Sequence, residues 1–329
     1  MEAALSQTLT STHRAAVVRR SGFRDARFHL LTATAAIIVL GIFGGVITAL
    51  GVGSMPAIRA FGFDFLTTET WNPVTEKFGA LASMYGTVIS SFIAMLIAVP
   101  VGIGIAIFLT EICPRALRRL IGIAIELLAG IPSIIYGIWG LFVFAPIFQA
   151  TAQPWIIDRL QDVPVLQDLF AGPPYGIGIF TASLILSIMI LPFISAVTRD
   201  VFETVPSTQK EAAYALGCTT WEVMWQVVLP FSRPGVVGGA MLALGRALGE
   251  TMAVTFVIGN AHRITESLFA PGTSISATIA NEFSEAVGDL YYSSLIELGL
   301  ILFGITFIVL AVAQLMLRAL ERRAGGVAA

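Results

Sequence analysis

Hydrophobic residues gather in six long runs that are separated by shorter polar segments. The runs cover about 29–53, 83–109, 118–145, 176–198, 234–258 and 291–317. A helix rises 1.5 Å per residue, so about 20 apolar residues suffice to cross a hydrocarbon core of about 30 Å. The first run is too long for the apolar part of a signal peptide, so we expect it to be a retained helix. The pattern predicts an all-α membrane protein with six transmembrane helices.

Composition supports this class. Of the 329 residues, 56% are hydrophobic and only 12% are charged, whereas soluble domains carry about 25% charged residues. Only two cysteines occur, Cys113 and Cys218. Both fall in loops that we place in the cytoplasm, where disulfides are rare, so we expect none here.

The distribution of Lys and Arg predicts the orientation, because cytoplasmic loops are enriched in these residues. With both termini inside, 14 of the 19 lie in cytoplasmic segments, four in outer loops and one, Arg246, within a span. The predicted division is a cytoplasmic tail at 1–28, a six-span domain at 29–317 with a long cytoplasmic loop at 199–233, and a second cytoplasmic tail at 318–329. The outer loops are acidic. We favour the interpretation that these are solvated loop charges, and the alternative is a docking surface for a partner protein.

Glycine pairs at GxxxG spacing let helices approach closely in lipid. The pairs are Gly41 with Gly45, Gly235 with Gly239, and Gly245 with Gly249. We favour packing within one subunit over a subunit interface.

Several catalytic signatures are missing from the sequence. It has no GxxxxGK[ST] phosphate-binding loop, and its only lysines are Lys77 and Lys210. No His/Cys cluster has metal-ligand spacing, and no nucleophile elbow is present. We therefore expect a chain that is not an enzyme and that holds no cofactor itself.

The loop at 199–233 is long for a connector. Pro206 and Ser207 predict the start of a short helix and Gly217 its end. A second helix is predicted from Thr219 or Thr220, ending before Leu229-Pro230. On periodicity alone, an amphipathic connector lying on the headgroups remains an alternative.

Two charges interrupt the fifth apolar run. If the fifth helix starts near Gly235, Arg246 lies about 16 Å along it, close to mid-bilayer, and Glu250 follows four residues later on the same face. An unpaired Arg at that depth costs about 2.5–3.5 kcal/mol, so we expect the two side chains to pair. The pair is either a structural link between helices or, as we favour, a gate or anion site in a translocation path.

In the third run, Glu126 lies near the cytoplasmic end and Pro132 should kink or break the helix. Ser133 is expected to satisfy backbone groups that the break frees. These residues suggest a cavity-lining element, with a kinked packing helix as an equal alternative. Glu297, near the outer end of the sixth run, is expected to reach the interface and is given no function.

Glu211-Ala212-Ala213, then Gly217, then Leu229-Pro230 resembles the EAA signature of binding-protein-dependent ABC importer permeases. Three further segments, GRALGETMAVTFVIGN at 245–260, LAGIPSIIYG at 128–137 and SLFAPGTSISATIANEF at 267–283, resemble the PstC-type permeases of phosphate ABC importers. The first 28 residues carry no such resemblance.

The resemblance implies a type I ABC importer permease fold in which the helix at 211–217 couples to an ATPase. It implies a heterodimer with a PstA-type permease, two ATP-binding subunits that hold ATP and Mg²⁺, and a soluble phosphate-binding protein on the outer face. It also implies that Arg246 and Glu250 function in transport of inorganic phosphate. The alternatives are an ABC permease for another oxyanion and a stand-alone ion-coupled transporter, which should show internal repeats that we do not find.

Overall fold

The structure, a computed structural model, describes residues 2–325, with side chains at residues 27–114 and 116–318. The chain divides into two units, Met1–Gly53 and Ser54–Ala329. Unit 1 is helix α1 (Glu2–Gly53), which continues through the predicted tail at 1–28, so the structure does not separate that tail from the first span.

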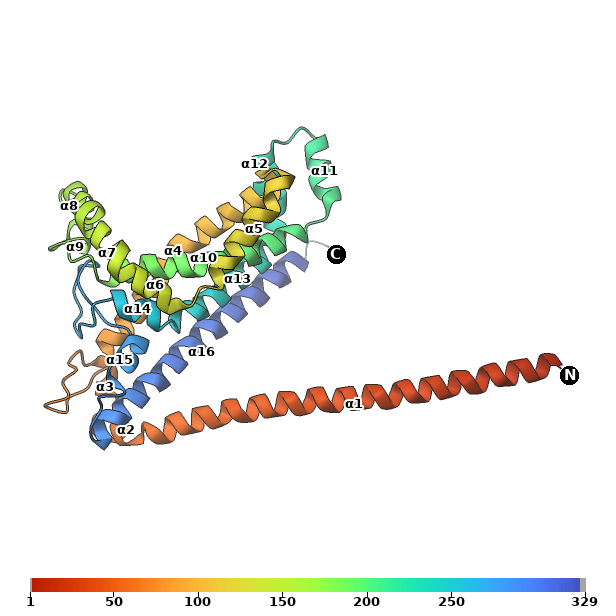
Figure 1. The fold of residues 1–329 in the computed structure, drawn as a ribbon, viewed down its shortest axis with the longest axis horizontal. Helices are drawn as coiled ribbons and strands as arrows, with labels where there is room; N and C mark the ends of the chain where they lie inside the picture. Colours follow the sequence, from red (N-terminus) through yellow and green to blue (C-terminus); the bar gives the residue numbers. More distant parts are fainter. Residues whose placement is uncertain (1, 326–329) are drawn as a thin grey trace. The chain divides into compact units, whose positions relative to one another are not determined.

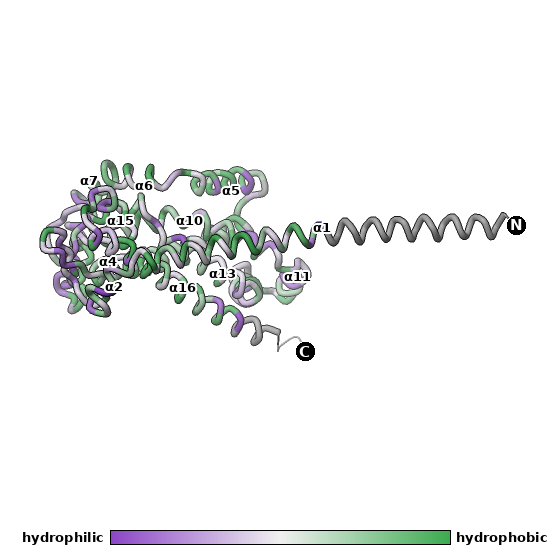
Figure 2. Tube along the Cα trace, turned by 90° about the horizontal axis from the view of Figure 1, so that it is seen from below, coloured by the Kyte–Doolittle hydropathy of each residue, from purple (hydrophilic) through white to green (hydrophobic). Residues whose placement is uncertain are grey.

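Within the described residues, six helices are long and apolar enough to cross a membrane, as the sequence predicted. They are Arg27–Gly53, Leu81–Ile112, Ser133–Leu160, Ile179–Glu203, Thr220–Leu248 and Asp289–Arg318. Figure 2 shows hydrophobic residues along these segments. Among residues 2–325 no strand forms, and only isolated bridges such as Asn72 with Lys77 occur. The predicted all-α membrane class is confirmed.

Unit 2 contains helices α2 to α16 and four short π-helical turns, η1 to η4. Their bounds are α2 Met55–Phe61, α3 Asp64–Thr67, α4 Leu81–Ile107, η1 Phe108–Ile112, α5 Arg115–Ala129, α6 Ser133–Trp139, η2 Gly140–Phe144, α7 Ala145–Ile147, η3 Phe148–Ala152, α8 Gln153–Leu160, α9 Leu166–Leu169, α10 Ile179–Glu203, α11 Ser207–Ala215, α12 Thr220–Val223, η4 Met224–Val228, α13 Leu229–Leu248, α14 Met252–Val257, α15 Ile275–Glu282 and α16 Asp289–Gly325.

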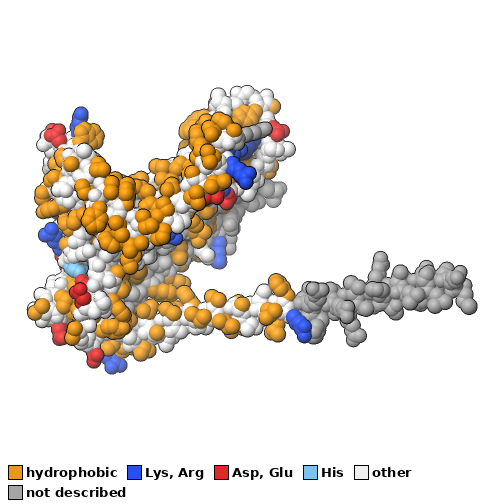
Figure 3. Space-filling model, viewed as in Figure 1, with side chains coloured by type: hydrophobic (Ala, Val, Ile, Leu, Met, Phe, Trp, Pro, Cys, Tyr) orange, Lys and Arg blue, Asp and Glu red, His pale blue; other side chains and the backbone are white. Residues whose placement is uncertain are grey.

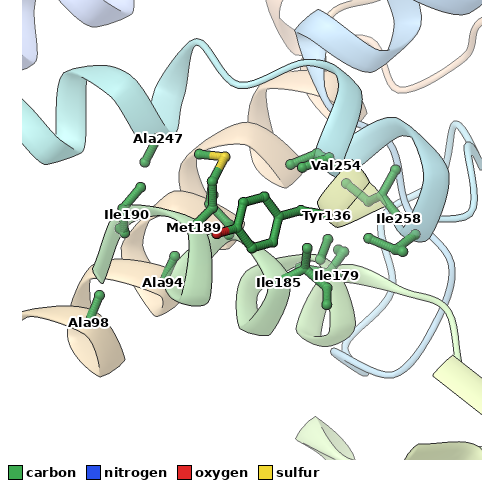
Figure 4. Packing of buried hydrophobic residues seen from close by; sticks show 14 of the residues in the cluster. Ala94, Ala98, Tyr136, Ile179, Ile185, Met189, Ile190, Ala247, Val254 and Ile258 are labelled. Atoms are coloured by element: carbon green, nitrogen blue, oxygen red, sulfur yellow. The ribbon is translucent and has the colours of Figure 1, made fainter. Parts of the chain in front are cut away.

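Helix α10 lies at the centre of unit 2 and packs along α4 and α13. Two thirds of its most apolar window is buried (67%), more than in any other span. Figure 4 shows Ile185, Met189 and Ile190 of α10 packed against Tyr136, with small residues such as Ala94 and Ala247 on the neighbouring helices. Small side chains on those helices leave room for the larger ones of α10.

The glycine spacing in the fifth span has the predicted intrasubunit role. A Cβ at Gly235 would lie 2.6 Å from Val201, and one at Gly239 would lie 2.6 Å from Val197. Both valines belong to α10, so the two glycines let α13 approach it closely. Gly245 lies beside Leu310 of α16.

The third span differs from the prediction at 118–145. α5 ends at Ala129, the chain turns at residues 130–132, and the membrane-length helix runs from Ser133 to Leu160. The hydropathy pattern missed this because apolar residues continue on both sides of the turn. Pro132 does break the helix, as predicted, since it has no N–H to donate.

The two ends of unit 2 carry different loops. α11, α12 and the start of α5 lie at one end, and α2, α3, α8 and α9 lie at the other (Figure 1). In Figure 3, hydrophobic side chains cover the middle of this unit, whereas Lys, Arg, Asp and Glu lie towards its ends. Within unit 2, the loop at 199–233 and the start of α5, both predicted as cytoplasmic, thus lie together, away from the predicted outer loops.

Candidate coupling and translocation sites

Helix α11 is short and presents most of its surface to solvent. Its residues are exposed except for Lys210, which is half-buried, and Ala213, which is buried. Ala213 packs in an apolar cluster with Ala106 of α4 and Phe202 of α10. Glu211 and Ala212 lie on the exposed face. The helix therefore rests on the membrane domain along one side and is free to meet a partner along the other.

Gly217 ends this element as the sequence predicted. Its φ of +87° lies in the left-handed region that favours glycine, and the residue follows Leu216, the C-cap of α11. The second helix also starts where expected. The Thr219 side chain accepts a hydrogen bond from the Glu222 N–H, and the Glu222 carboxylate accepts one from the Thr219 N–H. This reciprocal capping fixes the start of α12.

The predicted end of the second helix before Leu229-Pro230 is wrong. The helix continues from Thr220 through the π-helical turn η4 into α13, which begins at Leu229. Pro230 lies within this continuous helix, two residues after η4; its ring removes one backbone N–H from the ladder beside the π-helical turn, where the hydrogen-bond pattern already departs from that of an α-helix. One continuous helix therefore joins the coupling segment to the position of Arg246.

The predicted ion pair between Arg246 and Glu250 does not form among the described residues. Helix α13 ends at Leu248 and a new helix, α14, starts at Met252, so the two residues do not share one helical face. The i, i+4 rule applies only within a continuous helix. Arg246 is exposed in the last turn of α13.

Each of these charges lies at a helix end that suits its sign. Arg246 lies near the C-terminus of α13, where the helix dipole favours a cation. Glu250 is half-buried, and its Oε1 accepts a hydrogen bond from the Ala253 N–H at 3.3 Å in the first turn of α14. An anion is favoured there for the same reason. The break therefore stabilises both charges without joining them, and the guanidinium of Arg246 makes no ion pair with any side chain that the structure describes.

A second broken helix packs against this one. A Cβ at Gly137 of α6 would lie 2.9 Å from the Met252 oxygen and 3.2 Å from the Ala253 Cα of α14. α6 and α14 each restart a helix after a turn. Discontinuous helices of this kind line substrate sites in transporters.

The other predicted cavity residues separate in space. The Glu126 carboxylate pairs with Arg199 of α10 at 2.8 Å, and both line a pocket of about 460 Å³ between α5 and α10. Ser133 makes no side-chain hydrogen bond within the described part of the chain, so the expectation that it satisfies freed backbone groups is wrong. Instead the Tyr136 hydroxyl donates to the Leu128 carbonyl at 2.8 Å, which satisfies one of the carbonyls left free at the end of α5.

Buried hydroxyl groups hold the break to the rest of unit 2. The Ser276 hydroxyl donates to the Glu250 carbonyl at 2.6 Å. Next to Ser276, the Ile275 N–H donates to the Thr87 hydroxyl of α4 at 2.9 Å. The start of α15 thus links the backbone of Glu250 to α4.

Glu297 is buried, with 5% of its surface exposed, and its Oε2 has no hydrogen-bond partner. The expectation that it reaches the interface is therefore wrong. The cause is that α16 begins at Asp289 and packs against α15 along this stretch, where Leu295 and Leu298 lie in one apolar cluster with Ile275.

A cluster of residues in the predicted outer loops was missed by the sequence analysis. The Glu282 carboxylate accepts hydrogen bonds from Trp71 Nε1 at 2.5 Å, the Tyr291 hydroxyl at 2.7 Å and His262 Nε2 at 2.9 Å. Trp71 also stacks on His262, with ring centroids 5.5 Å apart. Burial raises the pKa of Glu282, but the three donors outweigh it, and the net pKa lies below the ordinary 4.5.

Comparison with known proteins assigns the chain to a class. The family model described as binding-protein-dependent transport system inner membrane component matches residues 98–326. This range includes α11 and the break at Arg246 to Glu250. The chain therefore belongs to this family of transport permeases and is a multi-pass inner membrane protein.

Curated relatives narrow the class further. The chain is 68% identical to the phosphate transport system permease protein PstC of Mesorhizobium japonicum (strain LMG 29417 / CECT 9101 / MAFF 303099), over 95% of each chain. It is 58% identical to the protein of that name in Pasteurella multocida (strain Pm70), over 91% of this chain and 93% of the relative. It is 38% identical to PstC 1 of Mycobacterium tuberculosis (strain ATCC 25618 / H37Rv), over 88% and 94%.

Solved structures agree on the fold. A bacterial alginate ABC transporter in complex with its alginate pentasaccharide-bound periplasmic protein matches with a TM-score of 0.57, at 16% identity, over 90% of this chain and 95% of that chain. The inward-facing MetNI methionine ABC transporter matches with a TM-score of 0.53, at 18% identity, over 74% and 94%. The type I ABC importer permease fold is confirmed.

Proposed function

We propose that this chain is the permease subunit through which an ATP-driven importer moves inorganic phosphate across the inner membrane. It forms half of the path, and a PstA-type permease forms the other half. Two separate ATPase subunits bind ATP and Mg²⁺ on the cytoplasmic face, where both termini lie. A soluble phosphate-binding protein delivers the anion at the outer face.

One observation carries the proposal. The similarity to a PstC protein runs over 95% of both chains at 68% identity, so it covers nearly the whole permease chain rather than one motif. The structure adds a fitting geometry, since α11 presents Glu211 and Ala212 to solvent while Ala213 rests on the membrane domain. Other oxyanions and a stand-alone ion-coupled mechanism gain no support from the relatives.

In the proposed mechanism, ATP binding closes the ATPase dimer and moves α11. The continuous helix from Thr220 to Leu248 carries this movement to Arg246. The guanidinium of Arg246 is exposed and has no ion pair among the described side chains, so it is available to an anion in the path. ATP hydrolysis is required for the switch of the path between its inward-open and outward-open states.

Variants of the coupling helix test this proposal in the assembled transporter. We expect Glu211→Lys and Gly217→Pro to keep ATP hydrolysis while phosphate uptake per ATP falls by about tenfold or more, because loss of one well-placed contact costs 1.4 kcal/mol or more. Proline fixes φ near −65° and so cannot adopt the +87° of Gly217. The measurement is uptake of labelled phosphate, alongside ATP hydrolysis, in proteoliposomes.

The matched control is Glu203→Lys, the same charge change at an exposed residue at the end of α10, outside α11. It should leave the ratio of phosphate to ATP unchanged. Normal transport by Glu211→Lys and Gly217→Pro would contradict the assignment of α11.

A further inference from the structure

Lys210 is one of two residues of α11 that are not exposed, and it makes an ion pair away from the ATPase-facing side. Its Nζ lies 2.6 Å from Oε1 of Glu111. The two side chains are only 19% and 13% exposed, respectively. Water and salt therefore screen this pair less than a surface pair. Removing one partner would leave a largely desolvated charge without compensation, which is strongly unfavourable.

Glu111 lies in η1, the π-helical turn that ends the second span, Leu81–Ile112. The neighbouring residue, Thr110, accepts a hydrogen bond from the Arg118 guanidinium of α5 through its backbone carbonyl, at 2.5 Å. The end of the second span is thus held to α11 on one side and to α5 on the other. Lys210 and Ala213 lie three residues apart on one face of α11. Lys210 makes a charged contact with the second span, and Ala213 makes an apolar contact with it.

The other end of α4 reaches the break that carries the charges of the fifth span. Thr87 of α4 accepts from the Ile275 N–H, and the adjacent Ser276 donates to the Glu250 carbonyl. In addition, the Ser83 hydroxyl of α4 lies 3.1 Å from that of Thr278. A chain of specific contacts therefore runs from α11 through the second span to Glu250, in parallel with the covalent route through α13.

We propose that Lys210 and Glu111 are positioning residues that fix the coupling helix to the second span, so that the ATPases move α4 together with α13. This inference rests on the proposed function, in which α11 is the coupling element. The ion pair transmits the movement of α11 to the second span, and neither residue contacts the transported anion. With it, the break between α13 and α14 is displaced from both sides. Without it, α11 turns on its apolar contact at Ala213 alone.

The experiment uses the whole transporter in proteoliposomes and measures phosphate transported per ATP hydrolysed. We expect Lys210→Gln and Glu111→Gln each to lower this ratio by about fivefold or more, since contacting charged pairs are coupled at this level. The amount of assembled complex should not change. Lys210→Glu should be worse than Lys210→Gln, because two carboxylates then face each other. The reversed pair, Lys210→Glu with Glu111→Lys, should recover most of the ratio.

Lys77→Gln is the matched control, because Lys77 is the only other lysine and is exposed in an outer loop. It should leave the ratio unchanged. The inference is overturned if the single variants keep a normal ratio, or if the reversed pair is no better than Lys210→Glu alone. If either of these overturning results is obtained but Gly217→Pro uncouples transport in the same assay, the role of the ion pair is wrong and the coupling function of α11 stands. If Gly217→Pro also transports normally, the coupling function of α11 fails with it.

Discussion

The Glu282 carboxylate joins three outer segments because it accepts hydrogen bonds from Trp71, His262 and Tyr291. These residues are up to 220 positions apart in sequence, so no local pattern could reveal the cluster. Hydrogen bonds to a charged group contribute about 1.5–3 kcal/mol each when the group is shielded from water. The cluster therefore holds the outer loops in one arrangement.

The lowered pKa of Glu282 gives a pH dependence with a definite sign. A carboxyl whose pKa is lower in the folded state stabilises the fold above the unfolded value and loses this effect as the pH falls through the folded value. Wild-type protein should therefore be more stable than Glu282→Gln by a constant amount above pH 4.5, and the difference should shrink below it. Thermal unfolding of the purified complex between pH 3.5 and 8, values set by that window, measures this difference. A difference that instead grows as the pH falls would contradict the account.

At the scale of single elements, the sequence predicted the spans well and the breaks poorly. Six apolar runs are sufficient evidence for six membrane helices, since lipid leaves the backbone no alternative. Pro132 indicated the turn before α6. The break after Leu248 has no proline, only Gly249, and glycine is common inside membrane helices. The i, i+4 spacing of Arg246 and Glu250 therefore suggested a pair that the broken backbone prevents.

The coupling segment was predicted in more detail because local chemistry encodes it. Ser207 begins α11 and Gly217 ends it, and Thr219 with Glu222 forms a capping box. The support beneath α11 was not predictable, since Lys210 and Glu111 lie 99 positions apart. Leu229-Pro230 was taken as a stop, but the helix continues through it, because a proline inside a membrane helix is tolerated where the neighbouring turn adjusts its hydrogen bonds, as η4 does here.

The ends of α13 and α14 give a prediction that separates capping from charge. Glu250→Gln keeps an oxygen that accepts from Ala253, so α14 should keep its stability, whereas Glu250→Ala should destabilise it by about 1 kcal/mol. Both variants, and Arg246→Gln, should assemble but fail to transport phosphate. Thermal unfolding and uptake assays of the same preparations give both answers. Full uptake by Arg246→Gln would reduce that residue to a structural role.

At the scale of the whole molecule, one helix joins the two candidate functional segments of the described chain. Its beginning at Thr220 follows the exposed α11, and its last turn before Leu248 carries Arg246. The chain itself has no phosphate-binding loop for ATP. In the proposed function, energy reaches this helix from a partner ATPase through α11, which is the reason that the orientation and support of α11 should matter for transport.

The most direct test of the central claim is uptake by the complete reconstituted transporter with its binding protein. Labelled phosphate should enter proteoliposomes only when ATP is present on the side of the ATPases. Unlabelled phosphate in excess should abolish the signal, and sulfate or molybdate at the same concentration should leave it unchanged. Uptake without ATP, or equal competition by sulfate, would contradict the assignment of this chain as the permease of a phosphate importer.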